Sequence, residues 1–380
     1  MPQPPRKPRI ALAHDWLVAR RGGEHVLEAI IDALTGEYDI AGILTMFDTG
    51  EPIARRIDDT PRHASRLNRL PLGLSASARR HLLPLYPLAV AELSRRLARM
   101  HAQRPIDLVI SSHSAAIKAI RPPAGVPHLC YCHTPARYIW SQTHTYGPAA
   151  LPLAMIRPFY RAWDRATAKR VTSFLANSAH TAEQIRRCYK RKADVLHPPV
   201  RTGFFTPSPE GEGRVPRGHH WLVVGALVPY KRFDLAIRAA NEASHPLTVV
   251  GDGPGRQQLR SIAGSTVTFV HDATDAQLRD HYRRAAMLIY PQQEDFGITA
   301  PEALACGMPV VAYDAGGARD TVTDGVTGAL FPTQTVESML AAIDRCPKHR
   351  ALVCREHAER FEPAAFREGI RRHARALVRV

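Results

Sequence analysis

Two glutamates eight positions apart, Glu294 and Glu302, carry the clearest chemical signal in this sequence. Glu294 follows the apolar run Met287–Tyr290, in a loop between an expected strand and an expected helix, and Glu302 falls in the first turns of that helix. A carboxylate in this position can accept hydrogen bonds from the hydroxyls of a ribose. The free N–H groups of a helix start suit a diphosphate. The alternative is a solvated helix start in which acidic residues are favourable.

Two adjacent cations, Lys231 and Arg232, follow the expected strand Trp221–Val224. Ligands of doubly wound sheets bind at the carboxyl ends of the strands, so both cations are expected beside a ligand. Their charges could neutralise a diphosphate, and an arginine could do so with two parallel hydrogen bonds. Two ordinary exposed cations remain the alternative, because the chain has 51 lysines and arginines.

The first half of the sequence adds a pair of glycines and a histidine. Gly22 and Gly23 follow the first expected strand and allow the backbone to approach phosphate or sugar closely. The full G-x-G-x-x-G pattern is missing, so a nicotinamide site is not supported. His133 follows the strand His128–Cys132, where its ring could donate to a sugar hydroxyl, although a structural histidine is the alternative.

Parallel sheets would position these residues, because short apolar runs alternate with amphipathic segments from end to end. We predict an α/β fold with two Rossmann-like, doubly wound parallel-sheet domains that face a central cleft. The domains are expected over residues 1–200 and 219–362, joined by a linker rich in proline and glycine over 201–218. A basic C-terminal helix is expected over 363–380.

Individual elements can be assigned from the same alternation. The expected strands of the first domain are Ile10–His14, Asp39–Leu44, Leu108–Ser112, His128–Cys132, Ser173–Asn177 and Ala193–His197. The expected helices between them are Glu24–Leu34, Ser75–His101, Leu151–Lys169 and Ala179–Tyr189. The expected strands of the second domain are Trp221–Val224, Leu247–Val250, Val267–Val270, Met287–Tyr290, Val310–Tyr313 and Ala329–Phe331.

Composition narrows the function classes. The net charge of +16 favours phosphorylated ligands, an anionic membrane face or nucleic acid, although a genome rich in G and C would also enrich arginine. Aromatic residues make up only 7% and do not interleave with the basic ones, which argues against a nucleic-acid-binding protein. None of the six cysteines has zinc-site spacing, so we expect reduced thiols, a cytoplasmic protein and no bound metal. We see no signal peptide and no apolar run of the ~20 residues that cross a membrane.

In this order, the motifs resemble glycosyltransferase family 4 over nearly the whole length. The segment from Glu294 to Ala312 is similar to the family's E-x7-E signature. The residues that follow, Gly316-Gly317 and Asp324–Gly328, are similar to the segment that usually comes after this signature in the family. Bacterial mannosyltransferases of O-antigen and exopolysaccharide assembly resemble this chain at His14-Asp15-Trp16, Arg21–Glu24, His133–Tyr138 and Val228–Arg232.

The resemblance implies a GT-B fold and a retaining, metal-independent transfer from a nucleotide diphosphate sugar. It implies GDP-mannose as the donor, with a UDP-sugar as the alternative. In these roles, Glu302 would hold the ribose hydroxyls, Glu294 would contact the donor sugar or position the acceptor, and Lys231 with Arg232 would stabilise the departing diphosphate. Many family members have an arginine directly after the glycine of the G-R-L-x-x-x-K pattern, where this chain has Ala226.

Further roles follow from the same resemblance. Backbone donors to the nucleotide sugar would come from Phe296, Gly297 and Ile298, and Gly22 and Gly23 would approach the donor from the other domain. His133 would touch the transferred sugar, and Asp15 and Arg137 would lie on the acceptor side.

The expected acceptor is a saccharide, free or linked to a polyprenyl diphosphate, in cell-surface polysaccharide synthesis. The basic and apolar stretches Arg79–Arg104 and Arg157–Arg170 could lie on the anionic inner leaflet of the cytoplasmic membrane. Amphipathic helices packed on a sheet would give the same pattern. A nucleotide-sugar epimerase or hydrolase on the same architecture is the alternative enzyme.

Overall fold

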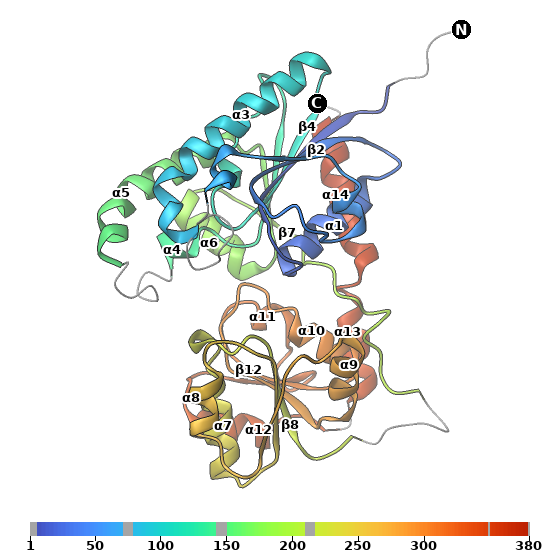
Figure 1. Ribbon diagram of the computed structural model, residues 1–380. Helices are drawn as coiled ribbons and strands as arrows, with labels where there is room; N and C mark the ends of the chain where they lie inside the picture. The colour runs from blue at the N-terminus through green and yellow to red at the C-terminus, as the bar shows by residue number, and fades with distance from the viewer. Residues whose placement is uncertain (1–5, 71–78, 142–149, 210–216, 349, 379–380) are drawn as a thin grey trace. The chain divides into compact units, whose positions relative to one another are not determined.

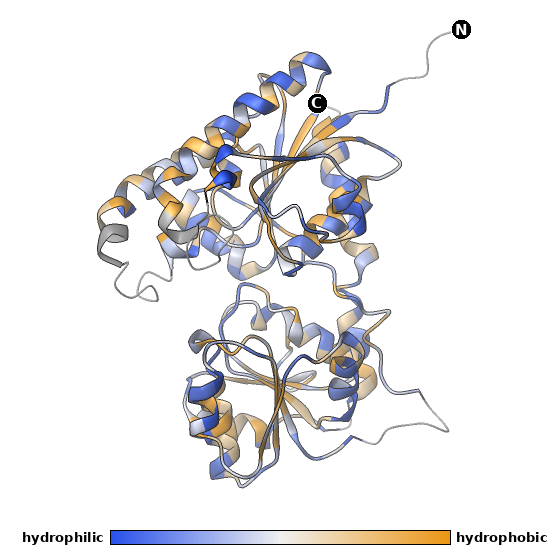
Figure 2. Cartoon of the chain, in the orientation of Figure 1, coloured by the Kyte–Doolittle hydropathy of each residue, from blue (hydrophilic) through white to orange (hydrophobic). Residues whose placement is uncertain are grey.

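The computed structural model describes residues 6–70, 79–141, 150–209, 217–348 and 350–378. The chain divides into two compact units (Figure 1). Unit 1 comprises Met1–His197 together with Phe366–Val380, and unit 2 comprises Pro198–Ala365. Each unit is built on a parallel sheet whose strands are largely apolar, as the orange ribbons of Figure 2 show. The predicted fold class, two Rossmann-like α/β domains, is confirmed in these two sheets.

Unit 1 contains a sheet of seven parallel strands in the order β3-β2-β1-β4-β5-β6-β7. The strands are β1 (Arg9–Leu17), β2 (Asp39–Asp48), β3 (Arg62–Ala64), β4 (Leu108–His113), β5 (His128–Cys132), β6 (Ser173–Ala176) and β7 (Asp194–Val195). Strands β1, β4 and β5 are almost entirely buried, because helices cover both faces of a parallel sheet. This burial explains why their sequences read as continuous apolar runs.

The helices of unit 1 cover the two faces of this sheet. They are α1 (Gly22–Leu34), α2 (Arg55–Asp58), α3 (Tyr86–Gln103), α4 (Arg137–Trp140), α5 (Ala150–Thr167), α6 (Ala179–Tyr189) and α14 (Pro363–Val378). The C-terminal helix α14 buries Phe366 and Ile370 in the same core as Val26 and Ile30 of α1, which ties the end of the chain to unit 1 (Figure 1).

One helix of unit 1 differs from its prediction. The helix expected over Ser75–His101 is an α-helix only from Tyr86, where Pro87 occupies the first turn. Residues 79–85 before it form a 3₁₀ helix that includes Pro84. Proline lacks the N–H of an α-helix interior, so the α-helix cannot extend back through this pair. Residues 71–78 lie outside the described residues.

Unit 2 contains six parallel strands in the order β10-β9-β8-β11-β12-β13. The strands are β8 (Trp221–Val224), β9 (Leu247–Val250), β10 (Val267–Val270), β11 (Met287–Tyr290), β12 (Val310–Tyr313) and β13 (Gly328–Phe331). The helices are α7 (Phe233–Glu242), α8 (Arg256–Ser261), α9 (Asp275–Arg284), α10 (Thr299–Ala305), α11 (Ala318–Thr321), α12 (Val336–Asp344) and α13 (Ala351–Glu359). The neighbouring strands β8 and β11 bring together the two strand-end loops that carry the charged motifs.

The segment expected as a linker behaves differently in its described part. Phe205 is fully buried in the core of unit 2, beside Tyr282. Arg355 of α13 donates to the carbonyl oxygens of Thr202 and Phe205. The burial of an aromatic ring outweighs the glycine and proline content here, so residues 201–206 belong to the second unit. Among the described residues, no helix is both long and apolar enough to cross a membrane.

Candidate functional site

Lys231 and Glu294 form the central ion pair at the strand ends of unit 2. Lys231 follows β8, Glu294 follows the neighbouring strand β11, and Nζ lies 2.8 Å from Oε1. Gly225, with a φ of +141°, makes room for the lysine, because a Cβ atom there would lie 2.7 Å from Nζ. Both charged side chains are partly exposed, at 12% and 20%, so a ligand can reach them.

Gly316 and Gly317 pack against the backbone of the loop that carries Glu294. The Gly317 N–H donates to the Glu294 carbonyl oxygen at 2.8 Å. A Cβ atom on Gly317 would lie 2.4 Å from the Phe296 Cα, so no larger residue fits. The double glycine noted in the sequence therefore fixes the position of the Glu294 backbone.

Glu302 is buried on α10 and has few partners. Tyr282 of α9 donates to its Oε2 at 3.3 Å, the one hydrogen bond this carboxylate receives from the described residues. Burial raises the pKa of Glu302 to about 7, against the opposing charge of Arg201. Arg201 itself is held by Asp275 at 2.7 Å. The carboxyl group thus changes charge near neutral pH and has hydrogen-bonding capacity to spare.

The side chains of the loop directly before α10 are buried or partly buried. Phe296 is 4% exposed and packs on Phe361, and Ile298 is partly buried against the same cluster. Gly297 has a φ of +82°, and a Cβ atom there would lie 1.8 Å from the Tyr290 hydroxyl, so glycine is required. The helix α10 has seven residues and ends at Ala305.

Arg232, expected to stabilise the departing diphosphate together with Lys231, is paired with a carboxylate in this structure. Its residue has a φ of +53°, at the start of α7. The guanidinium pairs with Asp234 at 3.1 Å and donates to the Gln334 side chain at 3.3 Å. The left-handed backbone turns the side chain toward these partners, so Arg232 is already neutralised by a carboxylate. Arg232 must therefore leave Asp234 if it is to supply the cation that is missing at Ala226.

Gln292 is a site residue that the sequence did not single out. It follows β11 by two positions and is 0% exposed, yet neither its amide nitrogen nor its amide oxygen has a hydrogen-bond partner among the described residues. An unpaired buried amide is costly, and a ligand or water that satisfies it gains stability. The sequence shows Gln292 and Gln293 side by side, and only burial distinguishes them.

His133 directly follows β5 in unit 1 and is a neutral imidazole. Its Nε2 lies 2.8 Å from the Ser112 hydroxyl, and its ring packs edge-on against Tyr131. Burial, together with the nearby charge of His14, lowers the pKa of His133 to about 3. The ring is therefore uncharged at neutral pH and suited to hydrogen bonding, not to charge stabilisation.

The double glycine starts α1, next to a second histidine. A Cβ atom on Gly23 would lie 3.5 Å from the His14 ring, whereas Gly22 has nothing within 4 Å. His14 Nε2 lies 3.9 Å from the Glu24 carboxylate. Burial alone would raise the pKa of Glu24, but the hydrogen bond and charge of His14 outweigh it and lower this pKa. The His14–Glu24 pair is a further feature to which the sequence analysis gave no role.

Asp15, expected on the acceptor side, holds a loop of unit 1 through backbone hydrogen bonds. It is 0% exposed, and its carboxylate accepts hydrogen bonds from the backbone N–H groups of the β4–Ile117 loop. The donors are Ser114, Ala115, Ala116 and Ile117, at 2.6–2.9 Å. Both carboxylate oxygens are occupied by these hydrogen bonds, so acceptor binding by Asp15 would require some of them to break. Arg137, also expected on the acceptor side, begins α4 and is partly buried.

Two family models match the chain in sequence. Residues 21–204 match the model described as Glycosyltransferase Family 4, and residues 208–368 match Glycosyl transferases group 1. D-inositol 3-phosphate glycosyltransferase of Mycobacterium sp. (strain JLS) is 32% identical over 211 residues, which are 49% of this chain and 48% of that protein. The protein of the same name from Kribbella flavida is 33% identical over 221 residues, 49% and 52% of the two chains. The chain spans about half the length of the curated relatives it matches.

Solved structures share the whole fold. Sucrose-phosphate synthase from Thermosynechococcus elongatus is 20% identical with a TM-score of 0.74, and the match covers 97% of this chain and 99% of that one. The lipopolysaccharide outer core galactosyltransferase WaaB is 15% identical with a TM-score of 0.72, at 97% and 99% coverage. HepE of Anabaena in complex with UDP is 17% identical with a TM-score of 0.69, at 97% and 100% coverage. At these identities, the likeness establishes the fold.

Proposed function

We propose that this chain, which combines a Glycosyltransferase Family 4 domain with a glycosyl transferases group 1 domain, transfers a sugar from a nucleoside diphosphate to an acceptor hydroxyl. The observation that carries the proposal is the polar group at the strand ends of unit 2: the Lys231–Glu294 pair, Glu302 and the unpaired Gln292. Nucleotides bind doubly wound sheets at this edge.

The donor would complete the hydrogen bonds that this edge lacks. The carboxylate of Glu302 accepts from the two ribose hydroxyls, a contact that favours its ionised form. Lys231 binds the diphosphate while Glu294 contacts the donor sugar, and the ion pair of 2.8 Å keeps both groups in position before the donor arrives. The resemblance assigns further backbone donors to the Gly297 loop, whose Phe296 and Ile298 side chains pack in an apolar cluster.

In the transfer, the bond from the anomeric carbon to the diphosphate oxygen breaks and a bond from that carbon to the acceptor oxygen forms. The acceptor proton passes to the leaving diphosphate on the same face, so the anomeric configuration is retained. Positive charge grows on the sugar ring and negative charge on the diphosphate. Lys231 stabilises that negative charge with a preorganised cation, the task that a divalent ion has in other enzymes, so no cofactor is required.

GDP-mannose is the donor we test first, because the motifs around His133 and Lys231 resemble those of mannosyltransferases. A UDP-sugar is the second candidate, because the structural neighbour HepE binds UDP. The acceptor is a saccharide or a polyprenyl-diphosphate-linked saccharide. A phosphorylated acceptor is also supported by the name of the relatives, D-inositol 3-phosphate glycosyltransferase. We place the reaction on the cytoplasmic side, in cell-surface polysaccharide synthesis.

A melting-temperature panel with EDTA tests the donor site. The ligands are GDP-mannose, GDP-fucose, UDP-glucose, UDP-N-acetylglucosamine and ADP-glucose. A donor at one hundred times its Kd adds about 2.7 kcal/mol to the folded state and raises the Tm. The shift should disappear in Glu302→Gln and persist in the control Glu337→Gln, which removes an exposed carboxylate from α12.

Different outcomes test the donor, the transfer reaction and the independence from metal separately. A shift with GDP-mannose alone supports the mannosyl donor. A shift with a UDP-sugar keeps the transferase and replaces the donor. Hydrolysis or epimerisation of the donor at an unchanged rate with and without acceptors would overturn transfer in favour of the alternative enzyme. A shift that needs a divalent ion would overturn the metal-independent step.

A further inference from the structure

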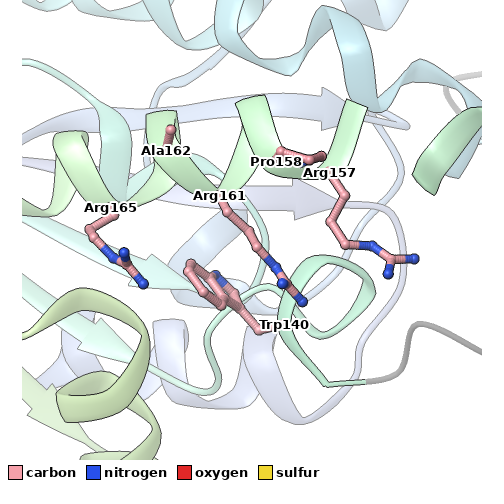
Figure 3. Close-up of a pocket in the computed structure, with 6 residues that line it drawn as sticks. All are labelled: Trp140, Arg157, Pro158, Arg161, Ala162 and Arg165. Carbon is pink, nitrogen blue, oxygen red and sulfur yellow. The ribbon is translucent and has the colours of Figure 1, made fainter. Parts of the chain in front are cut away.

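A pocket on unit 1 is lined by three arginines and one tryptophan (Figure 3). Its cavity volume is about 550 Å³, and its lining residues are Trp140 of α4 and Arg157, Pro158, Arg161, Ala162 and Arg165 of α5. The arginines are spaced four residues apart and so share one face of the helix. None of the residues assigned to donor or sugar lines this pocket.

The aromatic ring and the backbone hold two of the guanidinium groups in place. The Cζ atoms of Arg161 and Arg165 lie 5.1 Å and 5.4 Å from the centre of the Trp140 ring. The Nε of Arg161 donates to the Ile139 carbonyl oxygen, and that of Arg165 donates to the Cys188 carbonyl oxygen, both at 2.9 Å. With Nε used as an anchor, the terminal nitrogens of each group are left for a ligand.

No carboxylate among the described residues pairs with these arginines. The nearest acid on the helix, Asp164, is fully buried and bound to Lys118 Nζ at 2.7 Å and to the Trp140 indole nitrogen at 2.7 Å. The Nε of Arg157 is buried and has no hydrogen-bond partner among the described residues. By contrast, Arg186 and Arg187 of α6 both pair with Glu183. Three like charges on one helix face repel one another unless an anion joins them.

Two exposed apolar side chains stand on the same helix. Met155 is 76% exposed and Phe159 is 80% exposed, the highest values among the large apolar residues of the described chain. A cationic pocket beside exposed apolar groups suits a molecule that has a phosphate head and an apolar tail. We propose that the pocket binds the phosphate or diphosphate group of an amphiphile, with the apolar part on Met155 and Phe159. The binding goes beyond sugar transfer and needs no donor.

Vesicle binding tests this proposal without reference to activity. The full chain is sedimented with phosphatidylcholine vesicles that contain phosphatidylglycerol and, separately, with pure phosphatidylcholine vesicles. The variant R161Q/R165Q should bind the anionic vesicles about tenfold or more weakly, because each arginine near an anionic surface contributes to the attraction. The matched control R186Q/R187Q removes the same charge from α6 and should bind within about twofold of the parent chain. If the two variants lost vesicle binding equally, the pocket would not be the binding site, and the attraction would come from the positive charge of the whole chain.

Competition and an apolar variant distinguish the source of the phosphate. Inorganic pyrophosphate should release the parent chain from anionic vesicles more than sodium chloride of equal ionic strength does. M155S/F159S changes no charge and should weaken vesicle binding while it leaves the pyrophosphate effect intact. Pyrophosphate could protect the parent chain but not R161Q/R165Q from unfolding while neither chain binds vesicles. In that case the pocket binds a free phosphate group, and binding of an amphiphile is contradicted. Absence of both effects overturns the phosphate site.

Discussion

Buried polar side chains at the strand ends of the two units differ in how many hydrogen-bond partners they have. In unit 1, the carboxylate of Asp15 accepts backbone hydrogen bonds through both oxygens, and His133 is neutral and bound to Ser112. In unit 2, Glu302 receives one hydrogen bond from the described residues, and Gln292 receives none. Asp15 and His133 have hydrogen-bond partners without a ligand, whereas Glu302 and Gln292 would gain stability from a ligand that supplies partners. The difference favours unit 2 as the side that binds the nucleotide tightly.

The largest expected effect lies in unit 1, at Asp15. Asp15→Ala leaves four buried backbone N–H groups without an acceptor, and unit 1 should lose about 4 kcal/mol of folding free energy. Fluorotryptophan NMR can follow the unfolding of unit 1 through Trp16, Trp140 and Trp163, and that of unit 2 through Trp221. Unchanged stability of unit 1 would mean that the loop is held by other contacts and that Asp15 is free for an acceptor.

The next effect concerns catalysis at the edge of unit 2. Lys231→Ala should lower kcat by two to three orders of magnitude, because one preorganised donor to a developing oxyanion contributes about 3–4 kcal/mol. Arg232→Ala should cost less than about tenfold, because its guanidinium is paired with Asp234. Steady-state kinetics with a saturating donor measures both variants. If the two variants lost activity equally, Arg232 would leave Asp234 to bind the diphosphate.

The third effect is a loss of stability in unit 2 as the pH rises, which the buried carboxyl group of Glu302 causes. Burial raises the pKa of Glu302 from its usual 4.5 to about 7, so the folded chain holds a proton that the unfolded chain releases. The stability of unit 2 should therefore fall by about 3 kcal/mol as the pH rises from about 4.5 through 7. Glu302→Gln carries no such proton and should gain this amount over the parent chain between pH 4.5 and 8.

The control for this prediction is Glu337→Gln, an exposed carboxylate on the same unit. Its stability relative to the parent chain should stay constant with pH. The Trp221 resonance reports on unit 2 alone, so a titration in unit 1 does not interfere. A difference between Glu302→Gln and the parent that is independent of pH would show that Glu302 is ionised throughout and already well paired.

The sequence predicts the sheets well because their strands are buried on both faces. Strands β8 and β9 match the expected apolar runs at both ends. Strand β3, with the sequence Arg-His-Ala, was missed because an edge strand is only half buried and shows no apolar run. The closeness of Lys231 and Glu294 follows from the adjacency of β8 and β11, which a strand order of this type implies.

Side-chain direction was less accessible to the sequence. From sequence alone, a carboxylate near the end of a strand can either contact a bound ligand or accept backbone hydrogen bonds from a nearby loop. Asp15 accepts backbone hydrogen bonds. Arg232 has a left-handed backbone that turns it toward Asp234, and arginine gives no sequence signal for that conformation. Gln292 became a candidate only through burial without a partner.

The smallest expected effect tests whether the unpaired amide of Gln292 is kept for a ligand. Gln292→Leu has a similar volume and removes a buried polar group without a partner, so unit 2 without ligand should be more stable by about 1 kcal/mol. The same substitution should weaken donor binding by about tenfold if the amide hydrogen-bonds the nucleotide sugar. Urea unfolding followed at Trp221 measures the first effect, and donor titration measures the second. Gln293→Leu, at the neighbouring exposed position, is the matched control and should change neither quantity. A Gln292→Leu chain that is less stable and binds donor normally would mean that an ordered water, and not the donor, completes this amide, and the contrast between the two edges would then rest on Glu302 alone.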